Sequence, residues 1–145
     1  MIDISRLATT NSIEVLDDQI RVSATTRQVY VEKSPLVSDE LPVLGEAVKH
    51  IGHFQIRNKG TIGGSIAHAD PAAELPAVAV ALDAEFEITS KSDKFTVNAE
   101  DFFITYMTTT LQPTEMLTNI HFKKPPKGVG WGFREISMRE GDFAL

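Results

Sequence analysis

Alternation of apolar and polar residues predicts β-strands near both ends of this chain. In residues 1–7, Ile2 and Ile4 alternate with polar neighbours, a pattern typical of a strand with one buried face. Polar turns at residues 16–18 and 90–93 join two pairs of later segments into predicted hairpins. The other predicted strands are residues 13–15, 19–23, 84–89, 94–97, 116–122 and 132–138.

Capping residues and apolar spacing predict a helix in the first half of the chain. Ser34-Pro35 is a typical helix start, a capping hydroxyl followed by a proline at the first helical position. We expect Pro42 to kink or restart this helix and Gly52 to end it. The apolar residues that recur at helical spacing are Val37, Leu41, Leu44, Val48 and Ile51.

A second helix is predicted to begin at Asp70-Pro71 and to continue through the Ala-rich residues 72–82. Residues 99–103 predict a short helical turn. Residues 53–70 follow neither the helical nor the strand period, and we expect an irregular loop there. This order of elements predicts an α+β domain, an antiparallel sheet with flanking helices.

The composition is that of a globular chain without cysteine. Its 145 residues are 42% hydrophobic and 23% charged, which suits one domain or two small packed subdomains. The absence of cysteine excludes disulfides, a thiolate nucleophile, and zinc or iron–sulfur clusters held by cysteines of this chain. We therefore expect any redox chemistry to use a non-covalently bound cofactor.

The charge balance and hydropathy exclude two classes of partner. A formal net charge of −6 argues against nucleic acid, whose phosphates bind basic surfaces. The longest strongly apolar stretch, residues 75–82, is far shorter than the ~20 residues of a membrane-spanning helix. The N-terminus has neither the basic nor the apolar region of a secretion signal. We expect a cytoplasmic protein.

Residues 61–65 form the segment most suggestive of ligand binding. The adjacent Gly63 and Gly64 allow the backbone to approach a ligand closely. Successive free N–H groups beside the Thr61 and Ser65 hydroxyls would form an anion-binding nest suited to a diphosphate. A plain structural turn is the alternative, since pairs of glycines are common in turns.

The longer run around these glycines resembles a known family. Residues 55–65, QIRNKGTIGGS, continue into residues 66–76, IAHADPAAELP. This run resembles the FAD-binding (medium) subunit of molybdenum hydroxylases, the molybdopterin dehydrogenases of the carbon monoxide dehydrogenase and xanthine dehydrogenase type. Shorter similarities extend the resemblance over nearly the whole chain, at residues 24–26, 34–37, 101–103 and 139–144.

The resemblance implies an FAD site made of particular residues. The segment Thr61, Ile62, Gly63, Gly64 and Ser65 would wrap the FAD diphosphate. The resemblance places apolar flavin contacts at Ile51 and Leu117, a polar contact at Glu74 and a basic residue near the cofactor at Arg134. Asp70 lies within the motif, and we give it mainly a capping role.

Each of these residues also has a purely structural explanation. Ile51 would close an amphipathic helix, Leu117 lies on a predicted strand, and Glu74 suits a helix start. Arg134 could be an ordinary surface charge. The ligand-type residues His68, Asp70 and Glu74 do not share one face of an element, so we expect no metal site.

The resemblance implies an oxidoreductase flavoprotein subunit that works in electron transfer. Its partners would be a large molybdenum-cofactor subunit and a small iron–sulfur subunit, and the acceptor could be a nicotinamide, a quinone or oxygen. No side chain of this chain is expected to be catalytic, because FAD supplies the chemistry. The alternative is a truncated interaction module that does not hold FAD.

The resemblance also implies a division of the chain. Residues 1–10 would be a remnant of the first FAD-binding subdomain, residues 11–123 the second subdomain, and residues 124–145 a connector and the start of a C-terminal domain. The family's first glycine-rich motif, of the form AGGxxL, does not occur in this sequence. We therefore expect a fragment with weak or no retention of FAD.

Overall fold

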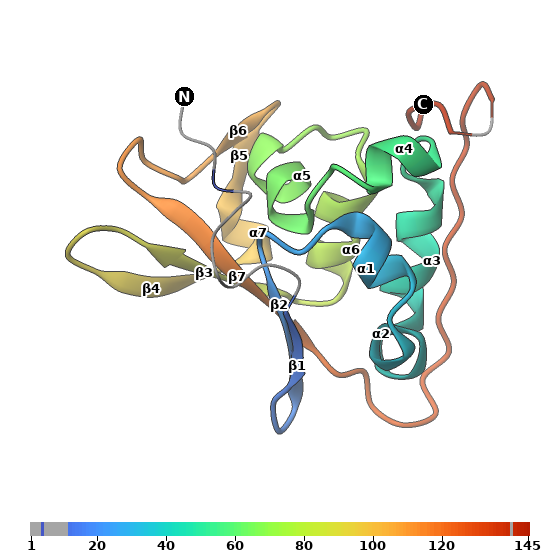
Figure 1. Cartoon of the computed structure of the whole chain (residues 1–145), viewed down its shortest axis with the longest axis horizontal. Coiled ribbons are helices and arrows are strands. Elements are labelled where there is room, and N and C mark those ends of the chain that lie inside the picture. Colours follow the sequence, from blue (N-terminus) through green and yellow to red (C-terminus); the bar gives the residue numbers. More distant parts are fainter. Residues whose placement is uncertain (1–3, 5–11, 140) are drawn as a thin grey trace.

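A five-stranded antiparallel sheet carries helices on one of its faces in the computed structural model, which describes residues 4, 12–139 and 141–145 (Figure 1). The predicted strand at residues 1–7 lies almost entirely outside the described residues. The strands are β1 (Ile13–Val15), β2 (Gln19–Ser23), β3 (Glu85–Thr89), β4 (Lys94–Asn98), β5 (Phe103–Thr105), β6 (Thr108–Thr109) and β7 (Met116–Lys123). The helices are α1 (Gln28–Glu32), α2 (Pro35–Glu40), α3 (Pro42–His50), α4 (Phe54–Arg57), α5 (Ile62–His68), α6 (Glu74–Ala81) and α7 (Ala99–Phe102).

The last strand in sequence lies at the centre of the sheet. The order is β1-β2-β7-β3-β4, so β7 pairs with an early and a middle strand. In this register Ile120 lies opposite both Val22 of β2 and Phe86 of β3, and all three side chains are buried. The sheet therefore closes only when distant parts of the chain meet.

The two predicted hairpins are confirmed. Leu16 and Gln19 exchange backbone hydrogen bonds at 2.8 and 3.3 Å, and the β1–β2 turn contains Asp17 and Asp18. The β3–β4 hairpin closes through the N–H of Ser90, which donates to the Asp93 carbonyl at 2.8 Å. Strand periodicity and polar turn residues were sufficient signals in both places.

The first predicted helix is confirmed with its expected interruption. The Ser34 hydroxyl accepts the N–H of Val37 at 3.3 Å, as an N-cap should. Helix α2 ends at Glu40 and α3 begins at Pro42, because proline cannot donate to the preceding turn. Gly52 follows the end of α3 with a φ of +43°, a left-handed conformation that glycine adopts without a steric penalty.

The start of the second helix was predicted too early. The carboxylate of Asp70 accepts the N–H of Ala72 at 2.9 Å, and the Asp70 carbonyl accepts the N–H of Ala73 at 3.0 Å. These bonds form a tight turn instead of a helix cap, and α6 begins at Glu74. Asp70 therefore stabilises the approach to the helix and is not its cap.

Three other regions differ from the predictions. Residues 53–70 are not an irregular loop, since they contain α4 and α5. Residues 132–138 do not form a strand, because the described structure gives them no partner strand beyond a single bridge from Ser137 to Ala144. The predictions also missed α1, β5 and β6, while the helical turn at residues 99–103 is confirmed as α7.

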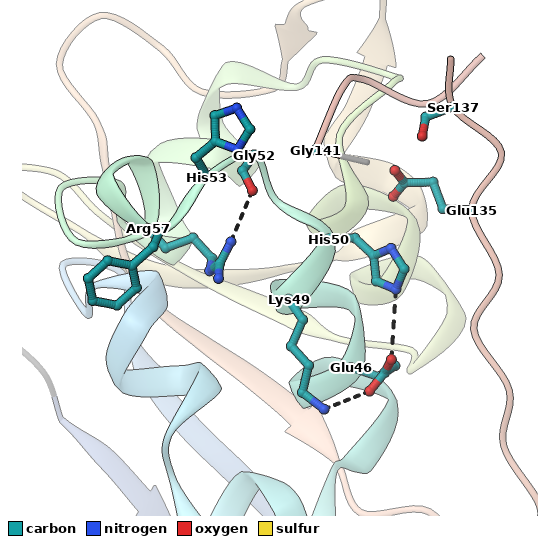
Figure 2. Close-up of a pocket in the computed structure, with 10 residues that line it drawn as sticks. Glu46, Lys49, His50, Gly52, His53, Arg57, Glu135, Ser137 and Gly141 are labelled. Atoms are coloured by element: carbon teal, nitrogen blue, oxygen red, sulfur yellow. Dashed lines mark hydrogen bonds and ion pairs between the residues drawn. The ribbon is translucent and has the colours of Figure 1, made fainter. Parts of the chain in front are cut away.

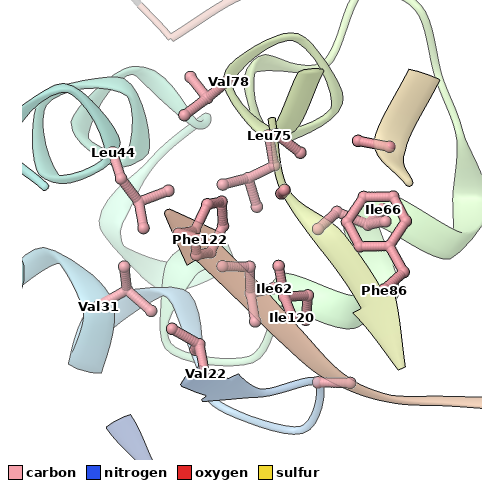
Figure 3. Close-up of a cluster of buried hydrophobic side chains, with 14 of the residues drawn as sticks. Val22, Val31, Leu44, Ile62, Ile66, Leu75, Val78, Phe86, Ile120 and Phe122 are labelled. Carbon is pink, nitrogen blue, oxygen red and sulfur yellow. The ribbon is translucent and has the colours of Figure 1, made fainter. Parts of the chain in front are cut away.

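The core lies between the sheet and the helices (Figure 3). The rings of Phe86 and Phe102 meet edge to face, with centroids 4.6 Å apart. Figure 3 labels the strand residues Val22, Phe86, Ile120 and Phe122 and the helix residues Val31, Leu44, Ile62, Ile66, Leu75 and Val78. Burial of these side chains fixes α5 and α6 on the sheet, and the candidate site depends on both helices. Within the described residues, none of the helices is long and apolar enough to span a bilayer.

Candidate functional site

The glycine segment at residues 61–65 forms the beginning of α5. Thr61 is the N-cap, and its hydroxyl oxygen accepts the N–H of Gly64 at 3.0 Å. Ile62 and Gly63 are buried, whereas Gly64 is exposed. The Gly64 backbone and the partly exposed hydroxyl-bearing residues Thr61 and Ser65 are thus the groups of this segment that a ligand could reach.

The predicted nest of free N–H groups is wrong. The N–H of Ile62 donates to the Thr26 carbonyl and that of Gly63 to the Ala24 carbonyl, both at 2.9 Å. The N–H of Gly64 donates to the Thr61 hydroxyl, and the N–H of Ser65 to the Thr61 carbonyl at 3.2 Å. The first N–H groups of a helix have no partners within it, and here the carbonyls of Ala24 and Thr26 and the Thr61 cap accept them. No helical period in the sequence of this segment indicates the helix.

Gly63 shows why a glycine is needed in this segment. A Cβ added there would lie 2.7 Å from both the Cα and the carbonyl oxygen of Ala24. The N–H of Ala24 in turn donates to the carbonyl of Thr118 on β7 at 2.9 Å. Leu117, the neighbour of Thr118, is 6% exposed and packs in the core. The predicted apolar contact Leu117 is therefore close in the fold to the glycine segment, but its side chain faces the core.

A polar pocket lies beside Ile51, between the end of α3, helix α4 and the C-terminal segment (Figure 2). Its volume is about 660 Å³, within the range of small-molecule sites. Ile51 is partly buried, and its neighbours His50 and Gly52 both line the pocket. The lining residues are Glu46, Lys49, His50, Gly52, His53, Phe54, Arg57, Glu135, Ser137 and Gly141.

Arg57 holds the wall of this pocket in place. Its Nη1 donates to the carbonyls of Ile51 and Gly52, each at 3.0 Å, and its Nε donates to Glu32 at 2.9 Å. The Arg57 side chain is only 12% exposed, so these charge-assisted bonds are partly shielded from water. The turn that carries Ile51 is therefore fixed by a side chain that the sequence did not single out.

A second pocket brings together Glu74 and Arg134. Both line a pocket of about 310 Å³ between the start of α6 and the C-terminal segment. Burial raises the pKa of Glu74 and outweighs a backbone hydrogen bond that lowers it; the Glu135 carboxylate raises it further, and His50 lowers it. The lining of this pocket therefore contains a carboxyl group of raised pKa and an arginine side chain.

The C-terminal segment is positioned by His50. Its ring packs against that of Phe133 at a centroid distance of 5.1 Å, although no strand pairing holds residues 132–138. This contact places Arg134 and Glu135 beside α3 and α6. No local sequence pattern indicates it, because His50 and Phe133 are far apart in the chain.

The predicted site residues fall into three places. Ile51, Glu74 and Arg134 surround the two pockets described above, whereas the residues of the glycine segment and Leu117 lie where α5 meets β7. Asp70 lines a different, apolar pocket of about 630 Å³ near the β5–β6 turn. Among the described residues, no group of three or more His, Asp or Glu side chains could hold a metal ion.

Comparison with known proteins connects this geometry to a family. Residues 1–125 match the family described as "FAD binding domain in molybdopterin dehydrogenase". The chain belongs to this family. The resemblance inferred from the sequence is thereby confirmed, and the family's cofactor is FAD.

Two curated relatives show the same relationship. The chain is 38% identical over its whole length to the 6-hydroxypseudooxynicotine dehydrogenase complex subunit alpha of Paenarthrobacter nicotinovorans, of which it covers 49%. It is 36% identical to the carbon monoxide dehydrogenase medium chain of Hydrogenophaga pseudoflava, with 99% of this chain and 50% of the relative covered. The chain thus spans about half the length of the curated relatives it matches.

Solved structures share the fold. Quinoline 2-oxidoreductase from Pseudomonas putida 86 superposes with a TM-score of 0.94 at 31% identity, covering 99% of this chain and 50% of that one. Carbon monoxide dehydrogenase from Hydrogenophaga pseudoflava gives 0.90 at 34% identity, covering 92% and 47%. These matches confirm the α+β prediction and do not favour the alternative of a module without flavin.

Proposed function

We propose that this chain is part of an FAD-carrying medium subunit in a molybdenum-dependent hydroxylase or dehydrogenase. In this role, electrons pass from iron–sulfur clusters on a partner chain to FAD and then to an acceptor. The observation that carries the proposal is the family match over residues 1–125, together with oxidoreductase relatives that align along the entire chain. Residues 11–123 are the second FAD-binding subdomain in this proposal.

The residues around the two pockets fit FAD chemically. Arg134 offers donors, Glu74 offers a carboxyl group, and Ile51 offers an apolar surface beside the larger pocket. A flavin nucleotide carries matching features: carbonyl oxygens, N–H and O–H groups, and a flat apolar ring system. Exposed Gly64 and the Thr61 and Ser65 hydroxyls are the proposed contacts for the diphosphate, where a phosphate oxygen would compete with Thr61 for the Gly64 N–H.

The chain's own task in this proposal is to bind and orient the cofactor. FAD supplies the redox chemistry when bound, because it takes up two electrons and delivers them to the acceptor. Arg57 keeps the Ile51 turn rigid, and the His50–Phe133 contact keeps Arg134 beside α6. No nucleophile or general base is needed from these side chains.

Two partners follow from the proposed role. The relatives include a "medium chain" and a "subunit alpha" of dehydrogenase complexes, names that imply larger assemblies. This chain has no cysteine, so the clusters that deliver electrons are proposed to reside on a small iron–sulfur partner. A large partner would hold the molybdenum cofactor and determine the substrate.

Flavin binding is the first test of the proposal. FAD is titrated into the purified chain at high protein concentration, and quenching of flavin fluorescence is followed. We expect weak, saturable binding that Glu74→Ala and Arg134→Ala each reduce, while Lys91→Ala in the exposed β3–β4 turn leaves it unchanged. Glu74→Ala and Arg134→Ala variants that bind FAD as tightly as the wild-type chain would contradict the proposed site.

Electron transfer is tested in the assembled complex. The complex is purified from its native source, and the flavin absorbance is followed without oxygen after addition of substrate or of a chemical reductant for the clusters. We expect the flavin to bleach after the clusters and to recover when the acceptor is added. A flavin that remains oxidised while the clusters are reduced would overturn this role.

A further inference from the structure

Glu135 connects the two pockets that surround the proposed FAD residues. Within the described part of the chain, it is the residue that lines both the larger pocket beside Ile51 and the smaller pocket of Glu74 and Arg134. Figure 2 shows its carboxylate in the larger pocket, on the C-terminal segment that faces His50. A ligand that occupies either pocket would therefore meet this side chain.

One oxygen of Glu135 has no hydrogen-bond partner. Its Oε2 is buried, and no donor of the described structure reaches it. Three donors of the pocket wall already have acceptors: Lys49 donates to Glu46, Arg57 to Glu32, and Ser137 to the Arg139 carbonyl. An unpaired buried carboxylate oxygen costs free energy, so a native structure normally supplies a donor.

The ionisable neighbours of Glu135 do not supply the missing donor. The Glu135 carboxylate raises the pKa of Glu74, which burial also raises. Glu74 is therefore a second acidic group near Glu135 and offers it no donor when ionised. Across the pocket, the His50 Nε2 lies 3.7 Å from Glu46 and is directed to that carboxylate. An N–H or O–H group of a ligand would satisfy Oε2.

We propose that Glu135 Oε2 accepts a hydrogen bond from FAD and thereby helps to position the cofactor, an inference that rests on the proposed FAD-binding function. The matching chemistry is an N–H or O–H donor of a nucleotide. FAD has such donors at both ends: the imide N–H of the isoalloxazine ring, and the amino and hydroxyl groups of the adenosine. Glu135 is a positioning residue in this proposal and takes no part in the redox step.

The test compares Glu135→Ala and Glu135→Gln with the wild-type chain and with the control Glu40→Ala, an exposed residue at the end of α2. Three probes are titrated: FAD, riboflavin and ADP. We expect Glu135→Ala to weaken FAD binding about ten- to a hundredfold, the effect of losing a hydrogen bond to a charged group. Weakened riboflavin binding would place the bond at the isoalloxazine, and weakened ADP binding at the adenosine.

Stability without ligand gives an independent readout. Removing an unpaired buried carboxylate relieves its desolvation cost, so we expect both Glu135 variants to melt at a higher temperature than the wild-type chain when FAD is absent. A residue with a purely structural role would lower the melting temperature. Opposite effects on ligand-free stability and on FAD affinity are the signature of this proposal.

The possible failures are distinguishable. If the wild-type chain binds FAD and Glu135→Ala binds it equally well, ordered water satisfies Oε2 and the proposal for Glu135 is overturned while the proposed function stands. If FAD binds equally well to the wild-type chain, to Glu74→Ala and to Arg134→Ala, the proposed FAD site is overturned, and the inference for Glu135 with it.

Discussion

The backbone of Gly63 donates its N–H to the carbonyl oxygen of Ala24 at 2.9 Å, and no side chain fits between the two residues. The added Cβ of alanine would lie 2.7 Å from the Ala24 Cα. Gly63→Ala must therefore move α5 away from the β2–α1 connection. We expect this variant to lower the free energy of unfolding by about 1–3 kcal/mol in urea denaturation.

The matched control for Gly63→Ala is Gly130→Ala. An added Cβ at Gly130 meets no atom within 4 Å, so this change should leave the free energy of unfolding nearly unchanged. Equal stability of Gly63→Ala and Gly130→Ala would contradict the close packing of α5 on Ala24.

Local signals were sufficient where one segment determines its own structure. The β1–β2 hairpin followed from strand alternation and a polar turn, and α2 followed from the cap at Ser34 and the proline beside it. The interruption at Pro42 followed from proline's missing donor. In each case the decisive residues are neighbours in sequence.

Predictions failed where a distant segment determines the structure. Helix α5 contains adjacent glycines, and it is fixed by bonds from its first turn to Ala24 and Thr26. Residues 132–138 have a strand-like pattern, but the centre of the sheet is already filled by β7 and its two neighbours. The central position of β7 itself has no local signal.

The site was predictable only in part for the same reason. The resemblance indicated Glu74 and Arg134, and the structure places both in one pocket. Arg57 was missed because its role depends on hydrogen bonds to the backbone carbonyls of the turn at Ile51. Glu135 was missed because it lines a pocket wall formed by segments about 80 residues apart in the sequence. A motif search cannot detect a buried oxygen that lacks a donor.

Glu87 on β3 should make stability depend on pH in the acid range. Burial raises its pKa, but hydrogen bonds from Lys94, Asn119 and Thr118 and the charge of Lys94 outweigh burial and hold the pKa at about 2, against a usual 4.5. Between these values the unfolded chain binds more protons than the folded one. Stability from Glu87 is therefore present above pH 4.5 and is lost as the pH falls toward 2.

The measurement is urea denaturation of the wild-type chain and of Glu87→Gln at several pH values. The shift corresponds to about 3 kcal/mol, so the stability difference between the two proteins should shrink by up to that amount between pH 5 and pH 2. Glu100→Gln on α7 is an exposed control. A difference that stays constant over this range would show that the Glu87 carboxylate is not selectively stabilised in the folded state.

Thr61 should contribute to stability through its cap. Thr61→Ala removes the acceptor of the Gly64 N–H, and we expect it to lower the free energy of unfolding by about 1 kcal/mol. Thr61→Ser keeps a hydroxyl at the same place and should restore most of this loss. If the serine variant is as unstable as the alanine variant, the hydroxyl does not act as the cap of α5.

Arg57 should matter more than its ion-pair partner, because it also holds the Ile51 turn. Arg57→Met leaves the Glu32 carboxylate and the carbonyls of Ile51 and Gly52 without their donor, and we expect a loss of about 2–4 kcal/mol in the free energy of unfolding.

Glu32→Gln tests this order of effects, because it leaves both carbonyl bonds of Arg57 in place. It should be less destabilising than Arg57→Met in urea denaturation, and it should weaken FAD binding less. Arg57→Lys should fall between them, since a single ammonium group cannot reach all three acceptors in the geometry of a guanidinium. If Glu32→Gln destabilises the chain as much as Arg57→Met, the ion pair accounts for the whole effect and the carbonyl bonds do not fix the turn beside the pocket.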